Sequence, residues 1–235
     1  MSLPHLRSVL LLTLLLVVLV APGQASYIAG KLDFSGDGVI VNNLGIDWLP
    51  QNLASATPPP SSTGDFRYQG PNHSGSFFSP SLVAGLLLGS IRDLPSGLGS
   101  GPLGANSLNN FLAFNTAYSP LLAGANFVLT NLQQGNIAPN NPIALTQSGS
   151  TVFAGISGNG YIFDNGNVSK FRVSFTTQFN DTTIAEVIAA GQTPAGIAAS
   201  WSGSLTANTP EPASALLCGS TLLGLGWIIR RRRRA

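Results

Sequence analysis

The chain has 235 residues, of which 44% are hydrophobic and only 9% are charged, whereas an ordinary soluble domain carries roughly 25% charged residues. That composition argues against a cytosolic enzyme. Five of the eleven Lys and Arg residues are consecutive, at positions 230–234. Residues 26–209 hold five cations and eight carboxylates, a formal balance of −3, so the sequence shows no basic footprint for nucleic acid.

The N-terminus has the pattern of a secretory signal peptide over residues 1–25. An apolar run at 9–20 follows Arg7, and about 12 residues are too few to span a bilayer core of about 30 Å. Gly23 and Ala25 provide the small side chains that signal peptidase accepts, with Ser26 next. We expect export through the Sec translocon and cleavage after Ala25; the alternative is an uncleaved N-terminal anchor.

The C-terminus, residues 210–235, has three parts. Pro210, Glu211 and Pro212 precede an uncharged stretch at 213–229, whose 17 residues reach about 25 Å as a helix, the lower limit for a membrane span. A cluster of cations then fixes the topology, because positive charge stays on the cytoplasmic side; it comprises Arg230, Arg231, Arg232, Arg233 and Arg234. The body at 26–209 therefore lies outside the inner membrane.

The order of these three parts resembles the PEP-CTERM sorting signal, with its motif at Pro210, Glu211 and Pro212. The resemblance implies an exosortase, a membrane enzyme of transpeptidase type, as partner. It also implies cleavage near the motif and transfer to the cell surface or exopolysaccharide matrix of a Gram-negative bacterium. Two prolines keep this segment extended and accessible to a protease. The alternative is a permanently anchored type I membrane protein.

The body is predicted to be a single, mainly β domain, sandwich-like or barrel-like, with one short helix. Short apolar runs separated by Gly, Asn, Ser, Thr and Pro favour this class. The clearest strands alternate at 170–179, where a bulge is expected at Thr176 and Thr177, and at 197–205. Two strands at 152–157 and 160–163 are expected to flank a turn at 158–159. The strand at 160–163 is expected to lead into a second turn at 164–166. Further strands are expected at 28–34, 39–42, 76–78, 111–115, 126–130 and 143–146.

The one helix of the body is expected after Thr183. Glu186 completes a capping box, and Gly191 with Pro194 provides the stop. Loops rich in Pro, Gly and Ser are expected near 50–71 and 95–110.

Few residues of the body point to chemistry. The chain has one cysteine, Cys218, so it can form neither an internal disulfide nor a metal site of several thiolates. Beyond the first 25 residues it has one histidine, His73, on which any histidine-dependent site would have to rest. The segment 33–38 opens like a calcium loop, but Leu44 stands where the bidentate carboxylate belongs, so a turn is the better interpretation. Residues 99–104 match a dinucleotide fingerprint without its strand and helix. We expect no metal, no cofactor and no catalytic residue.

The sequence thus predicts an exported, non-enzymatic envelope or matrix protein that is associated with exopolysaccharide or biofilm. Such a low-charge body meets water through hydroxyls and amides, and polysaccharide is a further expected partner, with four aromatic side chains available to stack on sugars: Trp48, Tyr68, Tyr118 and Trp201. The alternative from another class is a surface-displayed hydrolase, which would need two carboxylates about 5–10 Å apart in a cleft.

Overall fold

A computed structural model describes residues 27–42, 45–49, 63–77, 86–115, 122 and 124–208. The predicted signal peptide and the C-terminal sorting segment lie outside these residues. Within them, no helix is both long enough and apolar enough to cross a membrane.

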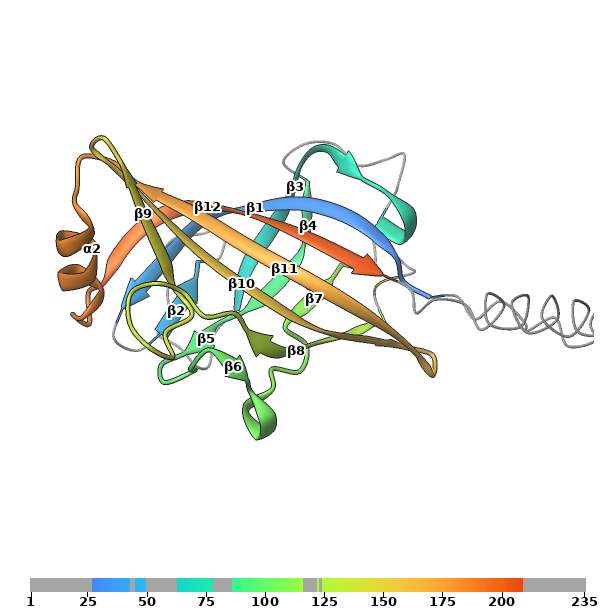
Figure 1. The fold of residues 1–235 in the computed structure, drawn as a ribbon. Helices are drawn as coiled ribbons and strands as arrows, with labels where there is room; N and C mark the ends of the chain where they lie inside the picture. The colour runs from blue at the N-terminus through green and yellow to red at the C-terminus, as the bar shows by residue number, and fades with distance from the viewer. Residues whose placement is uncertain are drawn as a thin grey trace, which may run out of the picture.

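The described part of the chain is mainly β, with one short α-helix, as expected (Figure 1). Its strands are β1 (Gly30–Asn42), β2 (Gly45–Trp48), β3 (Thr63–His73), β4 (Leu87–Arg92), β5 (Leu94–Pro95), β6 (Gly101–Pro102), β7 (Leu112–Phe114), β8 (Asn126–Leu132), β9 (Ala144–Ser148), β10 (Thr151–Asp164), β11 (Asn167–Phe179) and β12 (Ile197–Asn208). The helices are η2 (Gly75–Phe77), η3 (Gly104–Asn106) and α2 (Ile184–Gly191).

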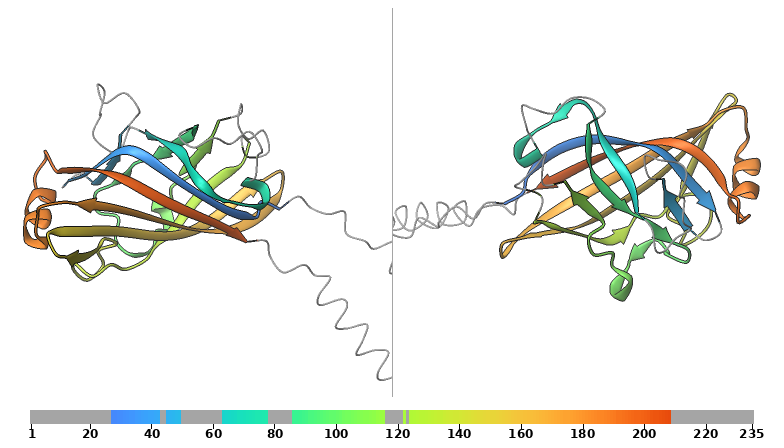
Figure 2. Two further views of the ribbon diagram at one scale, coloured as in Figure 1. Left: turned by 90° about the horizontal axis from the view of Figure 1, so that it is seen from above. Right: turned by 180° about the vertical axis from the view of Figure 1, so that it is seen from behind.

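The strands form one antiparallel sheet in the order β6-β8-β10-β11-β12-β1-β3-β4-β7, with β2, β5 and β9 paired beside this path. The sheet curls into a half-barrel rather than two stacked layers (Figure 2). Phe111 links its two sides: its N–H donates to the carbonyl of Phe127 in β8, and its carbonyl accepts from the N–H of Arg92 in β4. The curl encloses an inner face that becomes the main core.

The inner face alternates large and small residues across neighbouring strands. Gly203 lies between Phe34 and Phe175 in one cross-strand row, and Trp201 pairs with Gly36 in the next. A Cβ at Gly36 would lie 2.1 Å from the indole nitrogen of Trp201, so glycine is what lets the indole lie against β1. The rings of Phe34 and Trp201 meet edge to face at 5.8 Å, an arrangement that aromatic quadrupoles favour.

A second, smaller apolar cluster lies under α2 at one end of the sheet. Val187 packs there with Leu145, Val152 and Phe179. The predicted capping box is present: the Thr183 hydroxyl accepts from the N–H of Glu186, and the Glu186 carboxylate accepts from the N–H of Thr183. The helix covers the end of the sheet opposite the one where β1 begins and β12 ends (Figures 1 and 2).

Three expected breaks turn out to lie inside strands. The predicted turn at 158–159 is part of β10, where Gly158 and Gly160 admit β8, since a Cβ at Gly160 would lie 1.9 Å from the Val128 carbonyl. The predicted turn at 33–38 is part of β1, which shifts register between Gly36 and Val39. Residues 63–71 of the expected loop at 50–71 belong to β3.

Two further expectations are wrong in detail. β11 keeps an unbroken register against both neighbours, so no bulge occurs at Thr176 and Thr177. Thr177 takes an inward position, and its hydroxyl donates to the carbonyl of Ser200, which satisfies a polar group on an apolar face. The strand expected at 76–78 is instead the short 3-10 helix η2 over its described residues. The other predicted strands and the turn at 164–166 are confirmed.

Candidate functional site

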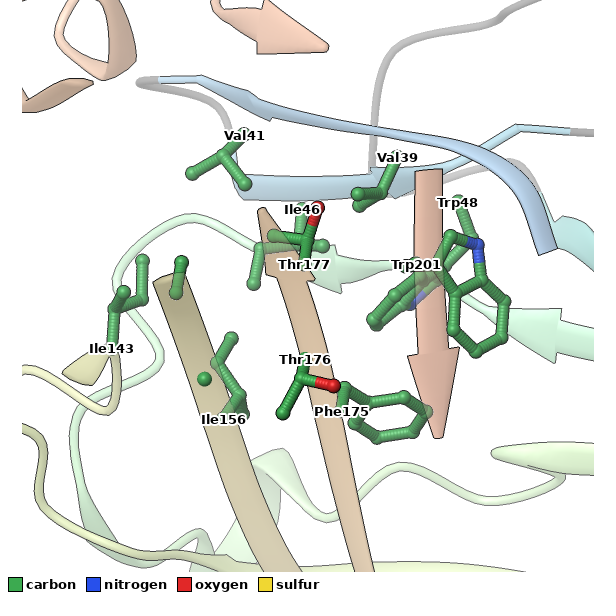
Figure 3. A pocket seen from close by; sticks show the side chains of 12 residues that line it. Val39, Val41, Ile46, Trp48, Ile143, Ile156, Phe175, Thr176, Thr177 and Trp201 are labelled. Atoms are coloured by element: carbon green, nitrogen blue, oxygen red, sulfur yellow. The ribbon is translucent and has the colours of Figure 1, made fainter. Parts of the chain in front are cut away.

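The pocket that described residues line in the interior of the curled sheet offers little room for a ligand. Figure 3 shows a pocket between Val39, Ile46, Ile156 and Trp48, and its apolar lining encloses only about 30 Å³. A water molecule needs roughly 10–15 Å³ of such space and two or more polar partners. This pocket is therefore a packing gap in the core.

Three of the four aromatic side chains that were expected to stack on sugars are buried in the core. Trp48 and Trp201 are 2% and 3% exposed, with ring centroids 4.7 Å apart, and Tyr68 is 4% exposed. They belong to the core because large rings fill the inner face of the curl. Tyr118 lies outside the described residues.

The outer face of β10, β11, β12 and β1 carries rows of hydroxyl groups. Ser174 and Ser204 lie opposite each other with their oxygens 2.9 Å apart, and Thr176 and Ser202 form the next pair at 3.0 Å. These rows continue onto the flanking strands. We call this surface the hydroxyl face; its residues are Ser35, Ser157, Ser174, Thr176, Ser202 and Ser204.

Two hollows lie along this outer surface and share Arg172 and Thr206. The smaller, of about 200 Å³, adjoins the hydroxyl face at Ser174 and Ser204. The larger, of about 970 Å³, extends toward the end of the sheet where β12 finishes. Arg172 pairs with Thr206 across β11 and β12, so one guanidinium serves both hollows. The arrangement presents donors and acceptors over a broad, open surface.

The far end of the larger hollow differs in character. Lys31 and Lys170 line it, and neither forms an ion pair with another residue that the structure describes. Exposed Tyr161 lies across from Lys170, and Phe163 across from Val168. We call this region the basic end; its residues are Lys31, Tyr161, Phe163, Val168 and Lys170.

Several carboxylates of the body have structural partners. Asp33 accepts from the Asn72 amide at 2.8 Å, and Asp37 forms an ion pair with Arg67 at 2.9 Å. These two acids are the ones that the calcium-loop pattern contains. Among the described residues, no cluster of three or more His, Cys, Asp or Glu side chains is suited to hold a metal ion.

Asp47 and Asp93 are the two buried carboxylates, at 3% and 0% exposure. They become neighbours because Ile46 of β2 pairs with Leu94 of β5. Asp93 accepts the backbone N–H of Trp48 at 2.9 Å, which anchors β2 against the start of β5. Neither acid lines the hollows of the outer face, so we assign this pair to the structure of the sheet.

The sorting motif Pro210–Pro212, the cluster Arg230–Arg234 and the cleavage site at Gly23, Ala25 and Ser26 lie outside the described residues. Comparisons with known protein families, with curated proteins and with solved structures find no match to the chain.

Sequence reasoning missed both the hydroxyl face and the basic end. Alternation in β11 and β12 was visible, and it placed Ser174, Ser202 and Ser204 on a polar side. The missing information was register, because Arg172 and Thr206 are 34 positions apart and meet only through the pairing of β11 with β12.

Proposed function

We propose that the chain is an exported, non-enzymatic protein of the bacterial cell envelope or extracellular matrix, sorted by an exosortase-type enzyme through its C-terminal segment. The observation that carries the proposal is the sequence of three parts at 210–235: a Pro-Glu-Pro motif, an uncharged stretch and five arginines. Each part has a physical role, since the prolines stay extended, the uncharged stretch enters lipid and the arginines remain inside.

The outer surface of the body supports a role in a hydrated matrix. Sugars offer hydroxyl edges that donate and accept hydrogen bonds, and the hydroxyl face presents the same kind of group in cross-strand rows. Arg172 adds five fixed donors between the two hollows. We therefore propose polysaccharide as the partner of the hydroxyl face, in place of the buried aromatic residues expected from the sequence.

The sorting proposal is tested by the intact mass of the protein recovered from a host that contains an exosortase. We expect a mature species that begins at Ser26 and lacks Arg230–Arg234. Changing Glu211→Ala together with Pro212→Ala should leave the tail in place and retain the protein in the membrane fraction. Glu186→Ala, which removes a carboxylate far from the motif, is the matched control and should be processed normally.

Two results would contradict the proposal in different ways. A mature wild-type protein that keeps Arg230–Arg234 would make the chain a permanently anchored type I protein. Recovery in the cytosol with residues 1–25 and 210–235 intact would remove the basis for export altogether.

A further inference from the structure

The exposed apolar side chains of the body gather at one end of the sheet. Five large hydrophobic residues are exposed in the described part of the chain, at 38–45%. Phe153 lies near the α2 end of β10, and Tyr27 precedes β1, whereas three of the five belong to the basic end: Tyr161, Phe163 and Val168. Large apolar side chains concentrated at one place on a polar surface mark an interaction site.

The hairpin between β10 and β11 makes this end project from the sheet. Asp164 pairs with Asn167 around a tight turn, in which Asn165 and Gly166 adopt φ values of 46° and 82°. These are the positive angles that a two-residue hairpin turn requires. Tyr161 and Phe163 precede the turn on the outer side of β10, with ring centroids 6.4 Å apart. The tip thus carries an aromatic pair on a well-defined scaffold.

Cations lie directly behind the aromatic pair. Lys170 pairs with Tyr161 on one side and with Asn208 on the other, and Lys31 lies on β1 across from Thr206. Asp164 is the one carboxylate in the turn, where it accepts from the Asn165 amide at 2.9 Å. Aromatic rings next to lysines form the combination that favours the interface of a membrane with acidic headgroups.

The chain itself brings this end to a membrane. β12 runs toward the hairpin tip and ends at Asn208 beside Lys170 (Figure 1). Residues 209–212 alone separate Asn208 from the uncharged stretch at 213–229, a reach of at most about 18 Å when extended. If that stretch spans the membrane, as the proposed function holds, the basic end is held within a short distance of the lipid surface.

We infer that the basic end docks on the outer surface of the inner membrane, with Tyr161 and Phe163 in the headgroup region and Lys31 and Lys170 on acidic lipids. This inference rests on the proposed C-terminal anchor. Docking holds the body against the bilayer and keeps Pro210–Pro212 at the level of the headgroups, where a membrane enzyme reaches its substrate. The opposite end, with α2, then points away from the membrane.

The test uses the full chain in vesicles made of equal parts phosphatidylcholine and phosphatidylglycerol, in which some lipids carry a nitroxide quencher. A fluorescent thiol label is placed by Phe163→Cys in a Cys218→Ala background. Phe153→Cys is the matched control, because it changes the same residue type on the same strand at similar exposure, 43% against 45%. We expect lipid quenching at position 163 and little at position 153.

The charge contribution is tested in the same vesicles. Changing Lys170→Gln should lower the ratio of docked to undocked body about fivefold, and Lys31→Gln by a similar factor, because a cation near an acidic surface contributes about 1 kcal/mol. High salt should have the same effect as these substitutions. Gln178→Ala, on the same face of β11 but near α2, should change nothing.

The failures are distinguishable. If the chain floats with the vesicles but both labels remain unquenched, docking is refuted and the anchor stands. If the chain does not float with the vesicles, the anchor itself fails and the inference with it. Quenching that is unaffected by charge substitutions would refute the role of the lysines. Protection of position 163 by a soluble acidic polysaccharide, without lipid quenching, would assign the basic end to polysaccharide instead.

Discussion

The inner and outer faces of β10, β11, β12 and β1 share one backbone but differ completely in chemistry. On the inner face, Phe34, Phe175 and Trp201 alternate with glycines and are nearly inaccessible to solvent. On the outer face, hydroxyl side chains occupy the middle of these strands and pair with one another, as Ser174 does with Ser204 and Thr176 with Ser202. Since side chains alternate along a strand, one set of residues can provide stability while the intervening set remains available for binding.

The contrast predicts that the inner face tolerates truncation poorly. Trp201→Ala should lower the free energy of unfolding by about 3–5 kcal/mol, the usual cost of deleting a buried aromatic ring. Trp201→Phe should lower the free energy of unfolding clearly less. The indole N–H has no hydrogen-bond acceptor among the described residues, so its removal leaves no polar group newly unpaired. Urea unfolding of the processed protein measures both. Equal losses for the two variants would show that ring volume is not what this site requires.

An intermediate effect is expected at the N-terminus of α2, which belongs to neither face. Thr183→Ala should lower the free energy of unfolding by about 1 kcal/mol, as loss of an N-cap commonly does. The backbone N–H of Thr183, then the hydroxyls of Thr183 and Thr182, donate to the Glu186 carboxylate and lower its pKa from 4.5. Because the pKa of Glu186 is lowered, the stabilisation by its ionised carboxylate is complete above pH 4.5. It is lost as the pH falls through the lower pKa of the folded state.

The matched variant for that pH dependence is Glu186→Gln. Its unfolding midpoint should fall less steeply than that of the wild type as the pH drops below 4.5. Identical profiles for both proteins below this pH would mean that the charge of the Glu186 carboxylate contributes nothing to stability.

Features that depend on neighbouring residues could be predicted from the sequence, whereas features that depend on distant contacts could not. The strands at β11 and β12 were predictable because their alternation is a local signal, and α2 was predictable because Thr183 and Glu186 sit at capping-box spacing. The segment at 158–160 misled because Gly and Asn favour turns locally. Its glycines are required instead by the close approach of β8, whose residues lie 26 or more positions away in the sequence.

Whether an individual aromatic side chain is exposed also depends on residues that are distant in the sequence. The sequence placed Trp48 among side chains available for stacking, yet β2 folds its ring against Phe175 at a centroid distance of 4.7 Å. Tyr161 and Phe163 have the same alternation as core residues but point outward. The pairing of β10 with β8 and β11, and not the composition of β10 itself, decides which of its side chains face the core and which face outward.

The smallest effect on stability is expected on the hydroxyl face. Ser204→Ala removes one member of an exposed hydroxyl pair and should change the free energy of unfolding by no more than about 0.5 kcal/mol, because water replaces the lost partner. Combined with Arg172→Gln, which removes the guanidinium shared by both hollows, it should nevertheless reduce retention of the processed protein on exopolysaccharide from its host. Gln147→Ala, on β9 away from this face, is the control. Because stability is unchanged, lost retention would identify the face as a binding surface, and unchanged retention would leave its hydroxyl rows as solvation alone.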